Sequence, residues 1–458
     1  MDASSEGNFE ASWKHRHHLR SVLFSETLQY VQKYVPWYSR SYANLPSEIN
    51  IGELDKIPLL KKETVISHYE EFINHSLQTA AVQHTSGTTQ NSFILQRSPE
   101  ELKYVYQFFS EVSNVHRDSD KSNTSFIVTL GRNTHGDPIL RPYKNKHLTI
   151  DLSNAAWRPH LKNILGSNQS LFAYLGNECN LIGPAHQILF LTTILIDDGF
   201  DFSTSLVKSI SCSGEYLTET KYAWLENTWG VKIRSDFSIC EVSGYAAKCT
   251  YCSNYHYEPI VLPDVIDIET GQSINHGIGF LTLTSLYPFT QKMPLIKYLT
   301  GDLVKVSRGT CEVDSLGFTP MGRVPQSIIQ TINNSLIIIP SADVLEVLDE
   351  FPDVAHVTTG HQYQELSSRY DVGYPLARLV FDKNSNEINL FIRLRYSPNF
   401  FWRQSAILQR LIEARMVEKC EGLQRLTRER LGKFSVQLLP PPKNPDEAAQ
   451  WSYRISQP

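Results

Sequence analysis

A strand, a helix and a second strand follow one another between residues 206 and 237, and this order restricts the fold more than any other feature. The run LVKSISCSGE, residues 206–215, has the apolar content of a buried strand. The next segment has the spacing of an amphipathic helix and stops at Gly230, which suits a helical C-terminal cap. VKIRSDF then fits the second strand. With a further strand at residues 125–131, this order predicts the α/β fold class.

The character of the sequence changes after Arg323, and the chain as a whole is long for one hydrophobic core. At 458 residues, two domains are the expected organisation. We predict a large N-terminal α/β domain, residues 1–322, and a small C-terminal α+β domain, residues 323–458. We predict a strand pair followed by a helix at residues 328–351 and a hairpin at residues 377–396. Residues 404–432 are predicted to be helical, and residues 434–442 to form a strand ended by prolines.

The charge and hydropathy of the chain argue against several classes of protein. The formal net charge is −5 and no long basic run occurs, so we expect no nucleic-acid partner. The N-terminal stretch lacks the apolar segment of a secretory signal, and the longest apolar runs, such as residues 190–196, are too short to cross a bilayer. We therefore expect a cytoplasmic protein without a membrane partner, whose seven cysteines are reduced thiols or metal ligands.

The segment HTSGTTQNS, residues 84–92, places hydroxyls and a glycine between two apolar, strand-like runs. Hydroxyl donors and the backbone N–H groups freed by Gly87 are suited to wrap a phosphate. A polar hairpin turn is the alternative interpretation, because Ser, Thr and Gly are common in turns. The segment is not a Lys-bearing P-loop, since no GK[ST] sequence follows it.

This segment also resembles a known phosphate loop. Thr85, Ser86, Gly87, Thr88 and Thr89 match the start of the TSGTTG loop of the adenylate-forming superfamily. Further segments resemble the phenylacetate–CoA ligase-like branch of that superfamily, and they occur in the same order. These segments are VPWYS, KIPLLKKE, SGEYLT, TWGVKI, FSICE, PLIKYLTGD and the Gly322–Arg323 pair. The resemblance implies a large AMP-binding domain followed by a small mobile domain.

The resemblance implies a role for each matched residue. Glu241 would help to hold Mg²⁺ beside the triphosphate, because a hard cation prefers carboxylate oxygen. Asp302 would accept hydrogen bonds from the ribose hydroxyls, and Arg323 would contact ribose or phosphate. The alternative interpretations are a surface carboxylate for Glu241, a simple turn for Asp302 and a surface arginine for Arg323. The expected catalytic residues are Glu241, Thr85 and Arg323. Further contacts with the nucleotide are expected from residues 85–89 and from Phe237 and Cys240. Ser213, Gly214 and Glu215 are expected to line the purine.

The family's activity implied by the resemblance has two steps. A carboxylate attacks the α-phosphorus of ATP to give acyl-adenylate and pyrophosphate, and a nucleophile then displaces AMP. We therefore predict activation of a small, aromatic carboxylic acid and its transfer to a thiol, of coenzyme A or a carrier protein, or to an amine. Transfer of AMP to a substrate hydroxyl and a degenerate, non-catalytic family member are the alternatives. Ser238 in place of the family's glycine favours a small acid, and the frequent dimers among relatives suggest a homodimer.

Several positions differ from the family's pattern. Gln90 stands where a glycine is usual, and Ser92 where proline is frequent. The lysine that relatives carry near the C-terminus is missing, because Lys443 lies too early and Arg454 is the only later cation. The Arg-Gly pair that shapes a pantetheine tunnel in relatives is also absent after the hinge. These differences leave a carrier-protein thiol, an amine or a hydroxyl open as the acceptor.

Four residues have the spacing of a short metal-binding knuckle. Cys249, Cys252 and His256 lie within eight residues, and Cys311 follows later. Thiolate and imidazole ligands from two segments can complete a four-coordinate zinc site. Some members of the branch that this chain resembles carry a structural zinc near these positions. Ordinary reduced cysteines beside a surface histidine are the alternative interpretation.

Overall fold

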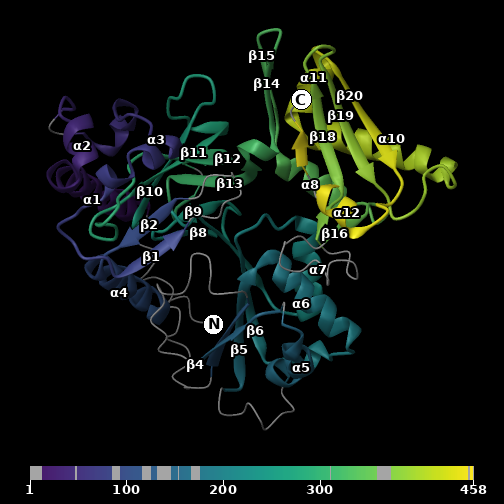
Figure 1. Ribbon diagram of the computed structural model, residues 1–458, viewed down its shortest axis with the longest axis horizontal. Coiled ribbons are helices and arrows are strands. Elements are labelled where there is room, and N and C mark those ends of the chain that lie inside the picture. Colours follow the sequence, from purple (N-terminus) through teal and green to yellow (C-terminus); the bar gives the residue numbers. More distant parts are fainter. Residues whose placement is uncertain are drawn as a thin grey trace. The chain divides into compact units, whose positions relative to one another are not determined.

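The computed structural model divides into two compact units, each built from separate stretches of the chain (Figure 1). Unit 1 comprises residues 1–124, 132–146 and 234–320, and unit 2 comprises residues 125–131, 147–233 and 321–458. Among the described residues, we find no helix with both the length and the apolar character needed to cross a bilayer. The structure describes residues 13–46, 49–84, 93–115, 125–130, 146–152, 154–166, 176–309, 311–357, 373–451 and 454–456.

Unit 1 joins helices from the first part of the chain to a sheet of antiparallel pairs. Its helical segments are α1 (Trp13–Tyr34), α2 (Pro36–Ser41), η1 (Ile51–Lys56), α3 (Lys62–Ser67), η2 (Tyr69–Phe72) and α4 (Pro99–Val115). Strands β1 (Ala81–His84) and β2 (Ile94–Arg97) form an antiparallel pair of their own. The larger sheet runs in the order β10 (Val261–Ile266), β11 (His276–Ser285), β12 (Tyr298–Arg308), β13 (Leu316–Arg323), β9 (Tyr255–Tyr257), β8 (Tyr245–Lys248) and β7 (Ile233–Ser238).

A buried arginine fixes helix α1 to this sheet. Arg20 is 4% exposed, and its guanidinium donates to the carbonyl oxygens of Val261 at 2.9 Å and Tyr257 at 2.8 Å. The same group pairs with the buried carboxylate of Asp314 at 2.6 Å. A buried charge is tolerated when it is paired and its donors are satisfied, and Arg20 meets both conditions. The contact therefore sets α1 against β9, β10 and the turn before β13.

Unit 2 begins with an α/β part. Strands β3 (Ser125–Leu130), β5 (Glu178–Pro184) and β6 (Val207–Ser213) are parallel, and β4 (Lys146–Ile150) lies at the edge beside β3. Helix α6 (Ala185–Asp197) connects β5 to β6, and its apolar side chains are buried in a common core with Trp229. These parallel strands with a connecting helix confirm the predicted α/β class. The other helical segments are η4 (Ala155–Trp157), α5 (Arg158–Leu165), η6 (Phe202–Thr204) and α7 (Glu219–Trp229), which ends at Gly230 in the left-handed conformation.

The C-terminal part of unit 2 has a core of its own. A four-stranded sheet in the order β20 (Lys433–Leu439), β19 (Glu387–Arg393), β18 (Ala377–Asp382) and β21 (Arg454–Ser456) carries helix α10 (Trp402–Lys419) against β20 (Figure 1). Its elements are η7 (Val324–Gln326), the hairpin β14 (Ile328–Ile332) and β15 (Ser335–Ile339), α8 (Ser341–Asp349), β16 (His356–Val357), β17 (Tyr374–Pro375), the hairpin β18 (Ala377–Asp382) and β19 (Glu387–Arg393), α10 (Trp402–Lys419), α11 (Glu421–Arg428), β20 (Lys433–Leu439), α12 (Pro445–Trp451) and β21 (Arg454–Ser456).

The helical stretch predicted at residues 404–432 is divided in the structure. It forms the two helices α10 and α11, because Cys420 between them has an extended backbone. Gly422 then lies against the backbone of β15, where an added Cβ would be 2.0 Å from the carbonyl oxygen of Ile338. Close packing of α11 on β15 therefore requires both the break and the glycine, and helical periodicity alone did not reveal either.

Two carboxylates of α8 hold the segment that leads into α7. Glu346 accepts hydrogen bonds from the Tyr216 hydroxyl at 2.8 Å and from the backbone N–H of Glu219 at 3.2 Å. Asp349, whose side chain is fully buried, accepts from the Thr218 hydroxyl at 2.6 Å and pairs with Lys221 at 2.9 Å. These contacts tie the first turn of α7, just after β6, to the C-terminal part of the same unit.

Asp349 has a third partner in His356, whose Nε2 lies 2.8 Å from the carboxylate. Burial by itself raises the pKa of Asp349, but the hydrogen bond from His356, the charge of Lys221 and the hydroxyl of Thr218 outweigh it, so the pKa lies below its usual value. The carboxylate therefore stabilises the fold above the pKa of an unfolded aspartate, about 4. That stabilisation is lost as the pH falls through the lower folded pKa.

We expect Asp349→Asn to lower the free energy of unfolding by about 3 kcal/mol at neutral pH, because it leaves Lys221 and His356 without their anion. The difference from wild type should shrink as the pH approaches 3. Urea unfolding followed by circular dichroism between pH 7 and pH 3 measures both effects. Glu387→Gln, at a solvent-exposed pair with Lys433, is the control and should change little. Equal stability of wild type and Asp349→Asn at pH 7 would contradict this account.

Candidate functional site

The structure brings together two of the residues that the sequence predicted. Glu241 follows β7 and is 9% exposed, and Asp302 lies in β12 and is 6% exposed. The charges of both carboxylates act on Tyr257, which is fully buried. Burial raises the pKa of Tyr257 well above its usual value, and the charges of Asp302 and Glu241 raise it further. Both carboxylates therefore act on the same phenol, although they are 61 positions apart in the sequence.

Aromatic rings and hydroxyls fix this pair of carboxylates. Tyr298 donates its hydroxyl to Oε1 of Glu241 at 3.2 Å. Tyr257 stacks on Phe318 with ring centroids 5.8 Å apart and meets the edge of Phe237 at 6.3 Å. Phe237, the residue predicted to lie near adenine, thus belongs to the aromatic layer beside the carboxylates.

Sequence reasoning missed an arginine that supports this region. Arg97 ends β2 and is 1% exposed, and its guanidinium donates to the carbonyl oxygens of Cys240 at 3.2 Å and Glu241 at 3.3 Å. The same guanidinium lies 3.6 Å from the fully buried carboxylate of Glu101. Two further donors, the backbone N–H groups of Gln291 at 2.8 Å and Lys292 at 2.6 Å, bind the other oxygen of that carboxylate. A lone arginine at the end of FILQR gave no sequence signal for this role.

The predicted purine-contacting residues lie in unit 2. Ser213 ends β6, and Gly214 has a φ of +79°, a left-handed conformation that favours glycine. The carboxylate of Glu215 accepts hydrogen bonds from the backbone N–H of His186 at 3.2 Å and lies 2.7 Å from its Nδ1. The chain therefore turns sharply at the carboxyl end of a parallel strand, the edge at which α/β sheets bind ligands.

The other predicted nucleotide contacts have separate outcomes. Arg323 is the last residue of β13, and its carbonyl oxygen accepts from the Ser327 hydroxyl at 2.9 Å. The phosphate-loop residues Thr85 to Thr89, with Gln90 and Ser92, lie outside the described residues. Their roles, like those of Arg323, stay predictions. The tail cation Arg454 lies in β21, paired in register with Arg378 of β18.

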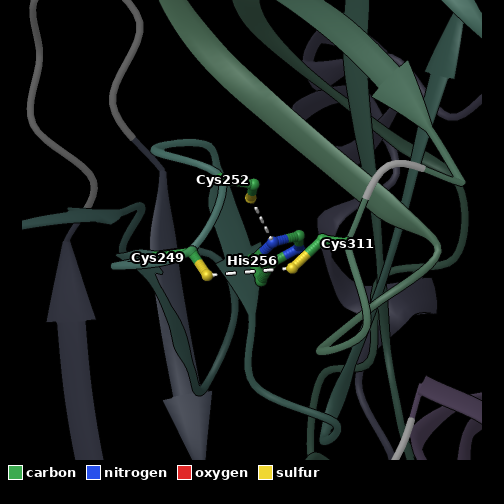
Figure 2. A group of neighbouring side chains, drawn as sticks. All are labelled: Cys249, Cys252, His256 and Cys311. Atoms are coloured by element: carbon green, nitrogen blue, oxygen red, sulfur yellow. Dashed lines mark hydrogen bonds between the residues drawn. The ribbon is translucent and has the colours of Figure 1, made fainter.

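The four candidate metal ligands lie together. All of their ligand atoms are within 4.8 Å of one another, and Figure 2 shows the sulfur atoms and the imidazole gathered around one centre. The Sγ atoms of Cys249 and Cys311 are 3.8 Å apart. This is the distance expected between two sulfur ligands of one tetrahedral ion, when the metal–sulfur bonds are about 2.3 Å long. The Sγ of Cys252 lies 3.2 Å from Nε2 of His256. Two turns, between β8 and β9 and between β12 and β13, supply the three thiols.

The tautomer of His256 also fits a metal ligand. Its Nδ1 lies 2.9 Å from the carbonyl oxygen of Leu316, so Nδ1 carries the proton and Nε2 presents a lone pair to the thiols. Burial lowers the pKa of His256 and raises that of Cys252 to about 12. Gly317 allows the close approach, since a Cβ there would lie 3.0 Å from Cε1 of His256. The donor set of three sulfurs and one nitrogen suits zinc.

Comparison with known proteins places the fold. No protein-family model matches the chain, and no curated protein matches it in sequence. 2-Hydroxyisobutyryl-CoA ligase in the postadenylation state, in complex with 2-HIB-AMP, aligns with a TM-score of 0.66 at 13% identity, over 97% of this chain and 90% of that chain. The chain has the fold of adenylate-forming CoA ligases.

Two further structures agree with this fold. An open conformation of 2-hydroxyisobutyryl-CoA ligase, in complex with 2-HIB-AMP and CoA, aligns with a TM-score of 0.62 at 14% identity, over 94% of this chain and 89% of that chain. ATP-bound MatB from Rhodopseudomonas palustris aligns with a TM-score of 0.50 at 13% identity, over 79% and 64%. At these identities the comparison concerns the fold.

We expect Arg97→Met to lower the free energy of unfolding by about 3 kcal/mol or more, because the buried carboxylate of Glu101 loses its counter-charge. The double variant Arg97→Met with Glu101→Gln should recover part of this loss, since no unpaired charge then stays buried. Urea unfolding of both single variants, the double variant and wild type completes the cycle. Strictly additive effects of the two substitutions would contradict the coupling.

Proposed function

We propose that this chain is an AMP-forming ligase that activates a small carboxylic acid with ATP as an acyl-adenylate and passes the acyl group to an acceptor. The observation that carries the proposal is the pair of nearly buried carboxylates, Glu241 and Asp302, whose charges both act on the buried phenol of Tyr257. Both belong to segments that resemble motifs of adenylate-forming enzymes. The shared fold supports the same conclusion, because solved structures of this fold are complexes with 2-HIB-AMP or ATP.

In this proposal each carboxylate has a separate task. Asp302 accepts hydrogen bonds from the ribose hydroxyls, because an ionised carboxylate is an acceptor only. Glu241 suits a divalent cation, since a nearly buried carboxylate, oriented by the Tyr298 hydroxyl, presents the oxygen donors that Mg²⁺ prefers. Bound Mg²⁺ would neutralise the charge that develops as pyrophosphate leaves. Arg323 and the hydroxyls of residues 85–89 contact the phosphates, and residues 213–215 line the purine.

The acid in this proposal is small and aromatic. Ser238 ends β7 beside the aromatic layer, and its side chain shortens the space that a glycine would leave. The acceptor is a thiol, of coenzyme A or a carrier protein, or an amine. The large domain extends to residue 322, the small mobile domain begins at residue 323, and the chain functions in the cytoplasm as a homodimer.

The decisive test is pyrophosphate release from Mg-ATP across a panel of small aryl and alkyl acids, with mass spectrometry of every product. We expect release with at least one aryl acid, and an acyl-AMP or its thioester or amide as product. Glu241→Gln should lower the rate on the order of 100-fold, because it removes a negative ligand at the triphosphate. Glu269→Gln, at an exposed turn of the same unit, is the matched control.

The products separate this proposal from its alternatives. A substrate whose mass rises by AMP would indicate adenylyl transfer to a hydroxyl. ATP binding without pyrophosphate release from any acid would indicate a non-catalytic protein.

We further propose that Cys249, Cys252, His256 and Cys311 bind one structural zinc ion. The supporting observations are the tetrahedral edge between two sulfurs and the Nδ1 hydrogen bond, which leaves Nε2 free to coordinate. Four protein ligands leave no open position for a substrate, so the ion would have a structural role.

We expect the purified protein to contain about one zinc per chain. Treatment with a strong chelator should lower the melting temperature, because metal binding contributes free energy of folding. Cys249→Ser should remove the zinc, whereas Cys420→Ala, at a buried thiol outside the cluster, should retain it. Elemental analysis with thermal unfolding gives both readouts. Wild-type protein without zinc after expression and purification in zinc-supplemented medium would contradict the proposal.

A further inference from the structure

Helix α10 has two apolar faces, of which only one packs on its own domain. The inner face buries Ser405, Leu408, Ile412 and Met416 against the neighbouring elements. Around the remaining, exposed side of the helix, Trp402 is 62% exposed, Ile407 61% and Leu411 54%. A helix at the surface of a domain normally has one apolar stripe and a polar outer face. The second apolar stripe therefore needs a separate explanation.

The α10 outer face continues into the residue two positions before the helix. Phe400 is 78% exposed and meets the ring edge of Phe401 at 4.8 Å. Exposed apolar side chains that occur singly are ordinary, but contiguous ones mark an interaction surface. We define the α10 outer face as Phe400, Trp402, Arg403, Ile407, Arg410 and Leu411.

The charge on this face has one sign. Arg403 and Arg410 are exposed, and neither forms an ion pair with an acid anywhere in the described ranges. The guanidinium of Arg403 lies 5.0 Å from the ring centre of Trp402. The acidic side chains of the helix are engaged elsewhere: Glu413 accepts from the backbone N–H of Val436 at 2.9 Å, and Glu418 pairs with Arg415 at 2.9 Å.

This composition is that of a protein–protein interface rather than of a solvated face. Aromatic side chains and arginine are enriched at the centres of interfaces, whereas lysine, glutamate and aspartate are depleted there. A helix that lies in a membrane surface instead keeps its cations on the polar face, apart from the apolar one. At helical spacing, Arg403 and Arg410 project between Trp402 and Leu411, within the apolar face. An acidic protein surface complements both features at once.

The spacing of the arginines specifies the partner further. Arg403 and Arg410 are seven residues apart, which is about 10 Å along a helix axis. A helix packed alongside α10 meets both guanidinium groups if its own carboxylates are also seven residues apart. Aliphatic side chains three and four positions after each carboxylate would then face Ile407 and Leu411.

We propose that the α10 outer face is the docking surface for an acidic amphipathic helix of another protein, with carboxylates at seven-residue spacing beside aliphatic side chains. The proposal does not depend on the ligase activity, because the helix face and its charges are sufficient for it.

The test uses the full-length chain and a synthetic helix of roughly 20 residues as the probe. The probe carries glutamates seven positions apart with leucines three and four positions after each. A second peptide has lysine in place of every such glutamate. Fluorescence anisotropy of the labelled peptides at low salt measures the dissociation constants. We expect the glutamate peptide to bind and the lysine peptide to bind about tenfold more weakly or worse.

Variants of the chain locate the binding. The double variant Arg403→Glu with Arg410→Glu should bind the glutamate peptide about tenfold more weakly or worse, and should bind the lysine peptide more tightly than wild type does. Arg428→Glu with Lys433→Glu makes the same change in net charge at exposed positions of α11 and β20, and should leave both affinities unchanged. Ile407→Ser should weaken binding of the glutamate peptide, whereas the melting temperature of the chain should stay that of wild type.

Other outcomes would overturn the proposal. Equal binding of the two peptides would show that the face does not recognise acidic side chains. Equal loss of binding in the α10 double variant and in the control double variant would show the same. Self-association of the chain that Ile407→Ser abolishes would assign the face to a second copy. Binding to phosphatidylserine vesicles that depends on Trp402 would assign it to a membrane surface.

Discussion

The three residues of β9 connect the two chemical centres of unit 1, and much of that unit depends on how they alternate. Successive side chains of a strand point to opposite faces. His256 therefore faces the cysteines, whereas Tyr257 faces the carboxylates of Glu241 and Asp302 and stacks on Phe318. A shift of one residue in the register of β9 would place a phenol among the thiols and an imidazole beside the carboxylates. The pairing of Phe318 in β13 with Tyr255 fixes that register.

Buried carboxylates that bind backbone N–H groups support both units. In unit 1, Glu101 accepts from the chain at Gln291 and Lys292, and Arg97 extends this support to the carbonyl of Glu241. In unit 2, Glu346 accepts from the first turn of α7. A buried carboxylate is costly unless its oxygens are satisfied, so such a group tolerates little movement of its partners. Each network therefore fixes a loop next to a residue that the proposed function uses.

The elements of the fold were largely predictable from local sequence, and the candidate site was predictable in part. Helix α7 with its Gly230 cap, the strands on either side of it and the hairpin β18–β19 follow from periodicity and turn residues. The break at Cys420 did not, because packing of Gly422 on the backbone of Ile338 outweighs the helical pattern of the sequence. Glu241 and Asp302 were found through motif resemblance. Tyr257, by contrast, occurs in no motif, and only its burial within the electrostatic influence of both carboxylates reveals it.

The sequence by itself determined the α/β class and the residue types available for chemistry, because hydrophobic periodicity and capping are local properties of the chain. It also supplied the metal-binding spacing of Cys249, Cys252 and His256. The tertiary structure brought the candidate Cys311 next to them, and it alone showed that Arg97 supports Glu241. It also decided that the second apolar stripe of α10 is exposed. These contacts join residues far apart in the chain, and their formation depends on the packing of whole strands and helices, which no local pattern encodes.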